Sequence, residues 1–495
     1  MVGKIILVST SEQGREAEFI LPLSLIYIAT PLRNAFDIKI IDQRVEKNWQ
    51  ETLREELSSE NVVCVGISSM TGPQITGGIE AASIAKKCSH SVPVVWGGVH
   101  PSLLPEETVA NEFVDIAVIG DGEETFSELV RVLHEGGDKE SVRGIIYKDG
   151  DSVVRTPARR QFPISKMGVP AYDLVDVERY KVISMGLNAK SLPLLTSRGC
   201  PYRCGYCYNT EFSQRKWTAL SPEQTISSII ELTTRYDIKD ILLLDDNFFV
   251  DLKRVARICE LLIKSDLDVT IYNANCRADT IVRMDDSFLQ LLKRAGFAQV
   301  FIGVESGSDE VLNRIKKDLT VEQVLTVNRR LKEAGIIPFY SFMVGFPFET
   351  TEDVKKTLCL MGCLLKENPE AIVFKLQYYT PFPGNELFHL ASELGMRFPG
   401  SLDGWANYHF DKINYNGFSA RHRRFLEDCH FYSTFLDKKL RASHSQYLKV
   451  ISNLYCKILK YRLEHGFYQF LYELYPLKVG RKIRNRWFAR GLRVK

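Results

Sequence analysis

The first third of the chain alternates short apolar runs with stretches whose apolar residues recur at helical spacing. This alternation is typical of parallel strands joined by crossover helices. The predicted strands are residues 4–9, 37–42, 62–68, 92–96 and 115–119, and the predicted helices are residues 23–34, 49–58, 77–87, 105–111 and 124–134. An Asp149-Gly150 turn predicts a small hairpin after them. We expect an α/β domain in residues 1–150, a doubly wound sheet with five parallel strands.

Loops rich in glycine and hydroxyl side chains follow three of the predicted strands. Ligands of such sheets bind at the carboxyl ends of the strands, so these loops predict a binding edge. The candidate contacts are Ser68, Ser69, Gly97, Gly98, His100, Gly120, Gly122 and Glu123. The loop at residues 9–14 lacks the G-x-G-x-x-G pattern, which disfavours NAD and FAD. Tight turns alone would also explain the glycines.

A second α/β series follows a polar, proline-containing stretch at residues 151–191, which we interpret as a linker and cap. Its predicted strands are residues 194–197, 240–245, 269–273, 299–304, 338–344 and 371–377, with helices such as 222–236 and 321–334 between them. Six βα units predict a partial (β/α)6 barrel in residues 192–385. Residues 386–495 predict a third, mostly helical region, whose aromatic residues, Trp405 and Tyr408 among them, favour a packed core over a pocket lining.

Length and composition narrow the class of protein. A chain of 495 residues is too long for one ordinary core, so several domains are expected. Apolar residues make up 45% and charged residues 25% of the chain, which excludes a largely disordered protein. The sequence contains no run near the ~18 apolar residues that a membrane span needs. The first residues lack a secretory cleavage pattern, so we expect a cytoplasmic protein.

Charge is distributed unevenly along the chain. Residues 438–495 contain fifteen Lys and Arg against two Glu, a net charge of +13; since the whole chain carries +3, residues 1–437 carry −10. The small overall charge argues against a nucleic-acid partner. Apolar residues interleave with the basic ones, which favours a cap helix packed on the barrel. The alternative is a membrane-surface helix followed by the polybasic residues 481–490, which would suit a lipid-like substrate.

Three of the eleven cysteines form a close group, Cys200, Cys204 and Cys207, in the spacing CxxxCxxC just after the first predicted barrel strand. A structural zinc site needs four ligands, and neither a fourth cysteine nor a histidine is near. A 4Fe-4S cluster held by three thiolates keeps one iron open for a substrate or cofactor. The group therefore predicts a catalytic 4Fe-4S cluster. Most of the other cysteines lie in apolar patterns and are interpreted as core residues.

The CxxxCxxC motif, with an aromatic residue before its last cysteine, resembles the radical S-adenosylmethionine (radical SAM) superfamily. The resemblance implies that SAM completes the open iron and is cleaved reductively to a 5′-deoxyadenosyl radical. It also implies SAM contacts at the ends of the barrel strands, although the Gly-Gly-Glu form of the methionine-binding motif is absent. The implied contacts are Tyr206, Asp245, Asp246, Arg277, Glu305 and Ser306, and Gly345-Phe-Pro347 ends the fifth strand.

The N-terminal domain resembles the cobalamin-binding domain that precedes the barrel in one large radical SAM class. Residues 22–33, Gly97-Gly98 with His100-Pro101, residues 120–126 and residues 379–384 carry this resemblance. It implies that cobalamin binds at the loop residues named above. The DxHxxG pattern that supplies a lower histidine ligand is absent, so we expect no such ligand on cobalt.

Three functions follow from the resemblance. The first is cobalamin-dependent methylation of an unactivated carbon, and the second is radical oxidation, cyclisation or rearrangement without methyl transfer. Methylthio transfer needs three further cysteines, and the N-terminal domain has only Cys64 and Cys88. A non-enzymatic cluster or corrinoid carrier remains a distant alternative. The expected partners are an electron donor such as flavodoxin or ferredoxin and a small, possibly lipid-like substrate, with peripheral membrane contact through the tail.

Overall fold

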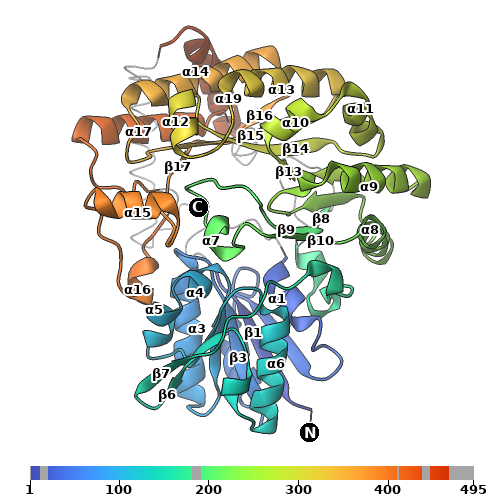
Figure 1. The fold of residues 1–495 in the computed structure, drawn as a ribbon, viewed down its shortest axis with the longest axis vertical. Helices are drawn as coiled ribbons and strands as arrows, with labels where there is room; N and C mark the ends of the chain where they lie inside the picture. Colours follow the sequence, from blue (N-terminus) through green and yellow to red (C-terminus); the bar gives the residue numbers. More distant parts are fainter. Residues whose placement is uncertain (1, 12–20, 181–190, 410–411, 437–445, 468–495) are drawn as a thin grey trace.

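The computed structural model describes residues 2–11, 21–180, 191–409, 412–436 and 446–467. Figure 1 shows the N-terminal sheet at one end of the molecule and the barrel at the other, with β9, β10 and α7 between them. The predicted α/β class with two sheet domains and a helical C-terminal region is confirmed.

The N-terminal sheet has seven strands in the order β2-β1-β3-β4-β5-β6-β7. Five of them run parallel, namely β1 (Lys4–Ser9), β2 (Asp37–Asp42), β3 (Val62–Ser68), β4 (Val94–Gly97) and β5 (Ile116–Val118). The predicted hairpin, β6 (Ile145–Asp149) and β7 (Ser152–Arg155), pairs antiparallel with β5. The hairpin therefore extends the predicted five-stranded sheet, and β7 lies in residues that we had assigned to the linker.

Helices cover both faces of this sheet, as a parallel sheet requires. Ile5 and Leu7 of β1 belong to the core with α1 (Leu23–Ala29) and α6 (Gly122–Glu135), whereas Ile6 and Val8 belong to the core with α2 (Trp49–Leu57) and α3 (Gln74–Cys88). After β4 come α4 (Val99–Leu103) and α5 (Pro105–Ala110), of which only α5 was predicted. Helix α1 ends before its predicted bound because Pro31 cannot donate the next backbone hydrogen bond.

The barrel is a parallel sheet in two hydrogen-bonded halves, β12-β11-β8 and β13-β14-β15-β16, with β17 on β15. Its strands are β8 (Ser191–Leu194), β11 (Asp240–Leu243), β12 (Thr270–Tyr272), β13 (Ala274–Cys276), β14 (Gln299–Glu305), β15 (Ile337–Val344), β16 (Ile372–Val373) and β17 (Gln377–Tyr378). Asn273, with a φ of 56°, separates β12 from β13, so the predicted strand at residues 269–273 corresponds to β12, and β13 was not predicted.

The first barrel strand differs from its prediction at residues 194–197. Strand β8 ends at Leu194, and Ser197 begins β9 (Ser197–Gly199), which pairs antiparallel with β10 (Trp217–Ala219). The reason is tertiary, because the buried carboxylate of Asp245 binds Thr196 and Ser197 and turns the chain there. The prediction was therefore three residues too late.

Barrel helices begin where their sequences can cap them. Helices α8 (Pro222–Tyr236), α13 (Val321–Ala334) and α14 (Thr351–Glu367) each start with a reciprocal capping box. Both predicted helices, 222–236 and 321–334, are confirmed to the residue. The remaining barrel helices are α9 (Leu252–Ser265), α10 (Ala278–Arg283), α11 (Asp286–Arg294) and α12 (Asp309–Arg314).

After the barrel the chain returns to the N-terminal domain through α15 (Glu386–Glu393) and α16 (Leu402–Trp405), drawn in orange in Figure 1. Trp405 is buried against α3 and α5, and its indole N–H donates to Glu107 at 2.8 Å. Tyr408 and, in α17 (Ala420–Ser433), Tyr432 are also buried, whereas Phe425 and Phe431 are partly buried and pack against the core. These positions support the predicted aromatic core.

Helix α19 (Gln446–Glu464) lies along α14 and buries Cys456, Leu459 and Leu463. Leu463 lies so close to Gly362 that a Cβ on this glycine would meet it at 2.8 Å. This packing supports the cap interpretation of the tail, whereas the polybasic residues 481–490 lie outside the described residues. None of the described helices combines the length and apolar character needed to cross a bilayer.

Candidate active site between the two sheets

The three grouped cysteines lie on a loop between β9 and α7 (Asn209–Phe212). The loop is fastened from both sides: the Gly205 N–H donates to the Ile315 carbonyl at 2.9 Å, and Asn385 donates to the Tyr206 carbonyl at 3.0 Å. Cys204 is buried, whereas Cys200 and Cys207 are partly exposed. The barrel thus holds this loop in place before any cofactor is added.

Burial raises the pKa of the Cys207 thiol to about 12 and also raises the pKa of Cys200. Both thiols need a nearby positive charge to bind as thiolates, and the irons of a cluster supply it. Within the described part of the chain, no group of three or more His, Cys, Asp or Glu side chains is placed to hold a metal ion. A 4Fe-4S cluster binds each cysteine through a different iron, so the donor set fits a cluster.

Asp245 and Asp246 follow the end of β11 but have different surroundings. Asp245 is fully buried and accepts the Thr196 N–H at 2.7 Å, the Thr196 hydroxyl at 2.6 Å and the Ser197 hydroxyl at 2.5 Å. Asp246 accepts the Gly199 N–H at 2.7 Å and is exposed to a cavity described below. The geometry favours a positioning role for Asp245, and its predicted contact with SAM stays a prediction.

Glu305, Lys317 and Tyr206 form a buried network at the end of β14. Lys317 Nζ lies 2.9 Å from Glu305 Oε1 and 3.0 Å from the Tyr206 hydroxyl, which donates to the same carboxylate oxygen at 2.9 Å. Although burial opposes the charge on Lys317, Glu305 and Cys204 raise its pKa. Glu305 has a left-handed backbone with a φ of 71°, a strained conformation that directs its carboxylate into the network.

Arg277 joins this network to the cluster loop. Its guanidinium donates to Cys204 Sγ at 3.5 Å, to Asp279 at 2.8 Å and to the Lys317 carbonyl. Ser306, by contrast, is fully buried, and its hydroxyl accepts the Ser308 N–H at 3.2 Å. Of the predicted SAM contacts, Tyr206, Arg277 and Glu305 thus converge beside the cysteines, whereas Ser306 supports the adjacent turn.

The turn after β15 depends on another buried carboxylate. Gly345 has a φ of 89°, and its N–H donates to Glu349 Oε2 at 2.5 Å. The other oxygen of Glu349 has no hydrogen-bond partner among the described residues. Burial raises the pKa of Glu349 to about 8, so it carries a proton over much of the physiological range.

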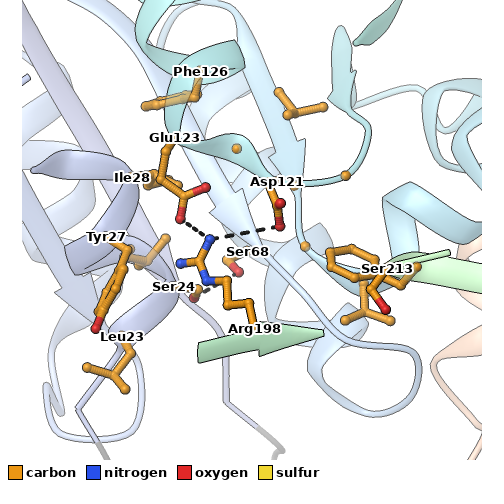
Figure 2. A pocket seen from close by; sticks show the side chains of 18 of the residues that line it. Leu23, Ser24, Tyr27, Ile28, Ser68, Asp121, Glu123, Phe126, Arg198 and Ser213 are labelled. Atoms are coloured by element: carbon orange, nitrogen blue, oxygen red, sulfur yellow. Dashed lines mark hydrogen bonds and ion pairs between the residues drawn. The ribbon is translucent and has the colours of Figure 1, made fainter. Parts of the chain in front are cut away.

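A cavity of about 370 Å³ lies where the carboxyl ends of the N-terminal strands face the cluster loop. Ser68, Gly97 and Gly120 line it from the N-terminal sheet, and Arg198, Asn209 and Asp246 line it from the barrel. Figure 2 shows Arg198 extending from its barrel strand between Tyr27 and the pair Asp121 and Glu123. The two domains therefore share one chamber.

The Arg198 guanidinium forms an ion pair with Glu123, which is 3% exposed, and lies 3.8 Å from Asp121. Its centre lies 5.1 Å from the centroid of the Tyr27 ring. Although burial opposes the charge, the two carboxylates raise the pKa of Arg198; burial also raises the pKa of Asp121 to about 6. A charged side chain two residues before the first cysteine thus reaches across to the N-terminal domain.

Most predicted cobalamin contacts line this cavity, and two do not. Those that line it are Ser68, Gly97, Gly98, Gly120, Gly122 and Glu123. Ser69 and His100 are buried outside it. His100 Nδ1 lies 3.1 Å from the Thr71 hydroxyl, its ring lies 6.1 Å from that of Trp405, and burial lowers its pKa to about 4. These contacts give His100 a packing role, and its predicted cobalamin contact stays a prediction.

The cavity fits a large amide-bearing ligand such as cobalamin. A Cβ at Gly97 would meet no atom closer than 4.0 Å, and one at Gly120 would meet nothing within 4 Å, so open space lies beside both backbones. Glu123 Oε2 is buried without a hydrogen-bond partner in the described structure, and a corrin amide N–H would satisfy it. No histidine is among the described residues that line the cavity, in keeping with the missing DxHxxG pattern.

Arg198, Tyr27 and Lys317 were absent from the predicted site. Arg198 stands inside the Thr-Ser-Arg-Gly-Cys stretch that precedes the cysteines, so its position next to the cluster loop was visible. Its partners lie about 75 residues earlier, in another domain. Lys317 follows α12 rather than a strand, and no sequence pattern marks it.

Comparison with known proteins identifies both parts of the site. The chain matches the radical SAM superfamily over residues 194–361 and the B12 binding domain over residues 17–130. An uncharacterized methyltransferase from Pyrococcus horikoshii is 30% identical over 372 residues, which are 75% of this chain and 78% of that protein. The anaerobic magnesium-protoporphyrin IX monomethyl ester cyclase of Rubrivivax gelatinosus is 28% identical over 384 residues, 77% of this chain and 65% of the cyclase.

A solved structure shares the fold across both domains. It is that of OxsB, a cobalamin-dependent S-adenosylmethionine radical enzyme, with aqua-cobalamin and S-adenosylmethionine bound. The likeness has a TM-score of 0.76 at 19% identity and covers 94% of this chain and 72% of OxsB. The arrangement of the two sheets is therefore shared with a protein that holds both cofactors.

Proposed function

We propose that this chain, which belongs to the radical SAM enzymes that carry a B12-binding domain, methylates an unactivated carbon of a small organic substrate. Members of this family are enzymes that use a 4Fe-4S cluster and SAM, with cobalamin as a second cofactor. The observation that supports the proposal is the shared chamber, in which the carboxyl ends of the N-terminal strands face the cysteine loop.

When bound, the cluster with SAM supplies a 5′-deoxyadenosyl radical and cobalamin supplies a methyl group. In our proposal Cys200, Cys204 and Cys207 hold the cluster, while Arg277 stabilises negative charge on Cys204 through its 3.5 Å contact. The network of Tyr206, Glu305 and Lys317 offers a carboxylate and an ammonium to the polar groups of SAM.

On the other side of the chamber, Gly97 and Gly120 leave room for the corrin, and Ser68 and Glu123 offer hydrogen bonds to its amides. The Tyr27 ring forms part of the wall of this chamber.

The relative from Rubrivivax gelatinosus supports the second candidate, a radical oxidation or cyclisation without methyl transfer. The relative from Pyrococcus horikoshii is named a methyltransferase, and the match covers 78% of its length, against 65% of the length of the cyclase. We therefore place methyl transfer first and keep cyclisation as the outcome to be distinguished.

The mass of the product tests the proposal. The anaerobically reconstituted enzyme is supplied with methyl-labelled SAM, cobalamin, a reductant and candidate substrates, and the products are examined by mass spectrometry. We expect 5′-deoxyadenosine together with a product heavier by one labelled methyl group. A product that has lost hydrogen, with no labelled methyl, would instead establish the second candidate.

Radical SAM enzymes generally require an electron donor, and this chain is expected to take one as well as a small-molecule substrate. We propose a flavodoxin or a ferredoxin as the donor, because the three-cysteine cluster is the acceptor that such proteins reduce. Peripheral membrane contact through the basic tail also remains a proposal, tested below.

A further inference from the structure

A second cavity, of about 220 Å³, adjoins the shared chamber. The two cavities have part of their lining in common, namely Gly120, Asp121, Gln161, Phe212 and Ser213. Most of its remaining walls come from the end of β7 and the segment after it, residues 155–161, and from the end of α7 and the loop that leads to β10, residues 211–216. Both domains therefore build it, and it lies directly beside the chamber.

The cavity lining is polar and predominantly cationic. Four cations line it, Arg155, Arg159, Arg160 and Lys216, against two carboxylates, Asp121 and Glu211. Two of the cations already have partners on the outside: Arg155 pairs with Glu106 at 2.7 Å, and Arg159 pairs with Glu124 at 3.2 Å and with Glu128.

Arg160 and Lys216 lack such partners. In the described part of the chain no carboxylate pairs with either cation, and Lys216 Nζ reaches only the amide oxygen of Gln214, at 3.3 Å. Asp121 does not neutralise them, because its carboxylate lies 3.8 Å from Arg198 and accepts the Phe162 N–H at 3.0 Å. One free cation from each domain thus faces the same space.

Two further features mark the cavity as a place for a ligand. The side-chain oxygen of Gln161, on the boundary between the two cavities, is buried and has no hydrogen-bond partner among the described residues. As an acceptor, it requires an N–H or O–H donor on the ligand and does not itself bind the anionic group. The backbone before Lys216 is left-handed at both Gln214 and Arg215, with φ of 51° and 58°. Consecutive non-glycine residues in this conformation are strained, and such strain gathers at binding sites.

We propose that this second cavity binds an anionic group, a phosphate or a carboxylate, of a ligand whose larger part occupies the shared chamber. An arginine offers paired N–H donors and a lysine offers a point charge, a combination suited to either oxyanion. The inference rests on the proposed function only in assigning the chamber to the corrinoid and substrate. Two sources have this chemistry, the phosphate in the nucleotide loop of cobalamin and an anionic substrate.

The first arm of the test uses inorganic phosphate on the full-length protein with its reconstituted cluster and no corrinoid. Thermal unfolding is followed against phosphate concentration at constant ionic strength. The R160Q/K216Q variant removes both cations, and the R54Q/K87Q variant removes two exposed cations on α2 and α3 as the matched control. All four side chains are exposed, so folding should be preserved.

We expect phosphate to raise the Tm of the wild type and the control, and the apparent Kd to increase at least 10-fold in R160Q/K216Q. The R160K/K216R variant should restore binding. Equal phosphate responses in the wild type, R160Q/K216Q and R54Q/K87Q would overturn the proposal. This arm needs no corrinoid and no turnover, so it gives a result even where methyl transfer is disproved.

The second arm separates the two sources by titration with cobalamin and with cobinamide, which lacks the nucleotide loop. A corrinoid phosphate in the cavity predicts that R160Q/K216Q weakens cobalamin binding at least 10-fold and leaves cobinamide binding unchanged. A substrate anion predicts that both corrinoids bind all variants equally and that phosphate still raises the Tm of the cobalamin-loaded wild type. Both patterns support the anion site, provided that the first arm is positive.

Discussion

The two sheets present their carboxyl ends to the same chamber but build their binding edges differently. The N-terminal edge consists of glycines and open space, with Gly97 and Gly120 free of neighbours on their cavity side. The barrel edge consists of buried charges that already bind one another, with Lys317 joined to Glu305 and Tyr206. A ligand at the first edge fills space, whereas a ligand at the second must replace existing bonds.

This difference has an energetic consequence for mutations. At the N-terminal edge, added volume should block binding without disturbing the fold. At the barrel edge, removal of one partner leaves an uncompensated buried charge, which costs about 3–5 kcal/mol. The predictions below test this contrast, beginning with the largest effect.

Replacement of Cys200, Cys204 and Cys207 by alanine should abolish the cluster. The anaerobically reconstituted variant should lose its iron, its sulfide and its charge-transfer absorbance, because no other described cysteines are grouped in this way. Corrinoid binding should persist, since the N-terminal edge is built from other residues. Cluster-like absorbance in the triple variant would contradict the assignment.

The Gly97→Phe substitution should lower the affinity for corrinoid at least 10-fold and leave the cluster intact. Gly97 has an ordinary backbone, so a side chain there extends into the cavity without strain. Gly98 is a poorer choice, because its φ of 102° and a clash with the Ser69 carbonyl would strain any substitution. Gly168→Phe, at another open glycine, is the matched control. Unchanged corrinoid affinity in Gly97→Phe would show that corrinoid does not bind beside Gly97.

The pH dependence of protein stability should show what a buried charge costs at Glu349 in the barrel. Its pKa is raised from 4.5 unfolded to about 8 in the folded protein. The folded state therefore holds the extra proton, and the free energy of unfolding should fall as pH rises from about 4.5 to about 8. Glu349→Gln should flatten this slope, as measured by urea midpoints at pH 6 and pH 8. Glu352→Gln, an exposed carboxylate three residues later in the first turn of α14, is the control.

The smallest effect concerns the tail. Residues 468–495 contain eight Lys and Arg against one Glu, and each cation near an anionic bilayer contributes roughly 1 kcal/mol. The full chain should pellet several-fold more with anionic than with neutral vesicles, and a chain ending at Phe467 should lose the difference. This end point retains α19, whose buried residues pack on α14. If both chains pelleted equally with anionic vesicles, the membrane role of the tail would be disproved and only the cap role would stand.

Local sequence predicted the elements better than it predicted the roles of site residues. Strands β1, β2 and β3 matched their predicted bounds because a buried apolar run is a local property. The positioning role of Asp245 was not visible, since its partners lie almost 50 residues earlier in the chain. His100 follows a glycine pair of the expected kind, yet its burial against Trp405 depends on a segment about 300 residues later.

The ion pair between Arg198 and Glu123 makes the two halves of the enzyme thermodynamically interdependent. Arg198 precedes Cys200 by two residues, and Glu123 lies in the first turn of α6 at the N-terminal edge of the chamber. A corrinoid amide that binds the unpaired oxygen of Glu123 would change the strength of the pair that its other oxygen forms with Arg198, and so would act on the loop that carries the cysteines. Because such coupling is reciprocal, cluster loading would change corrinoid affinity by the same factor that corrinoid changes cluster affinity.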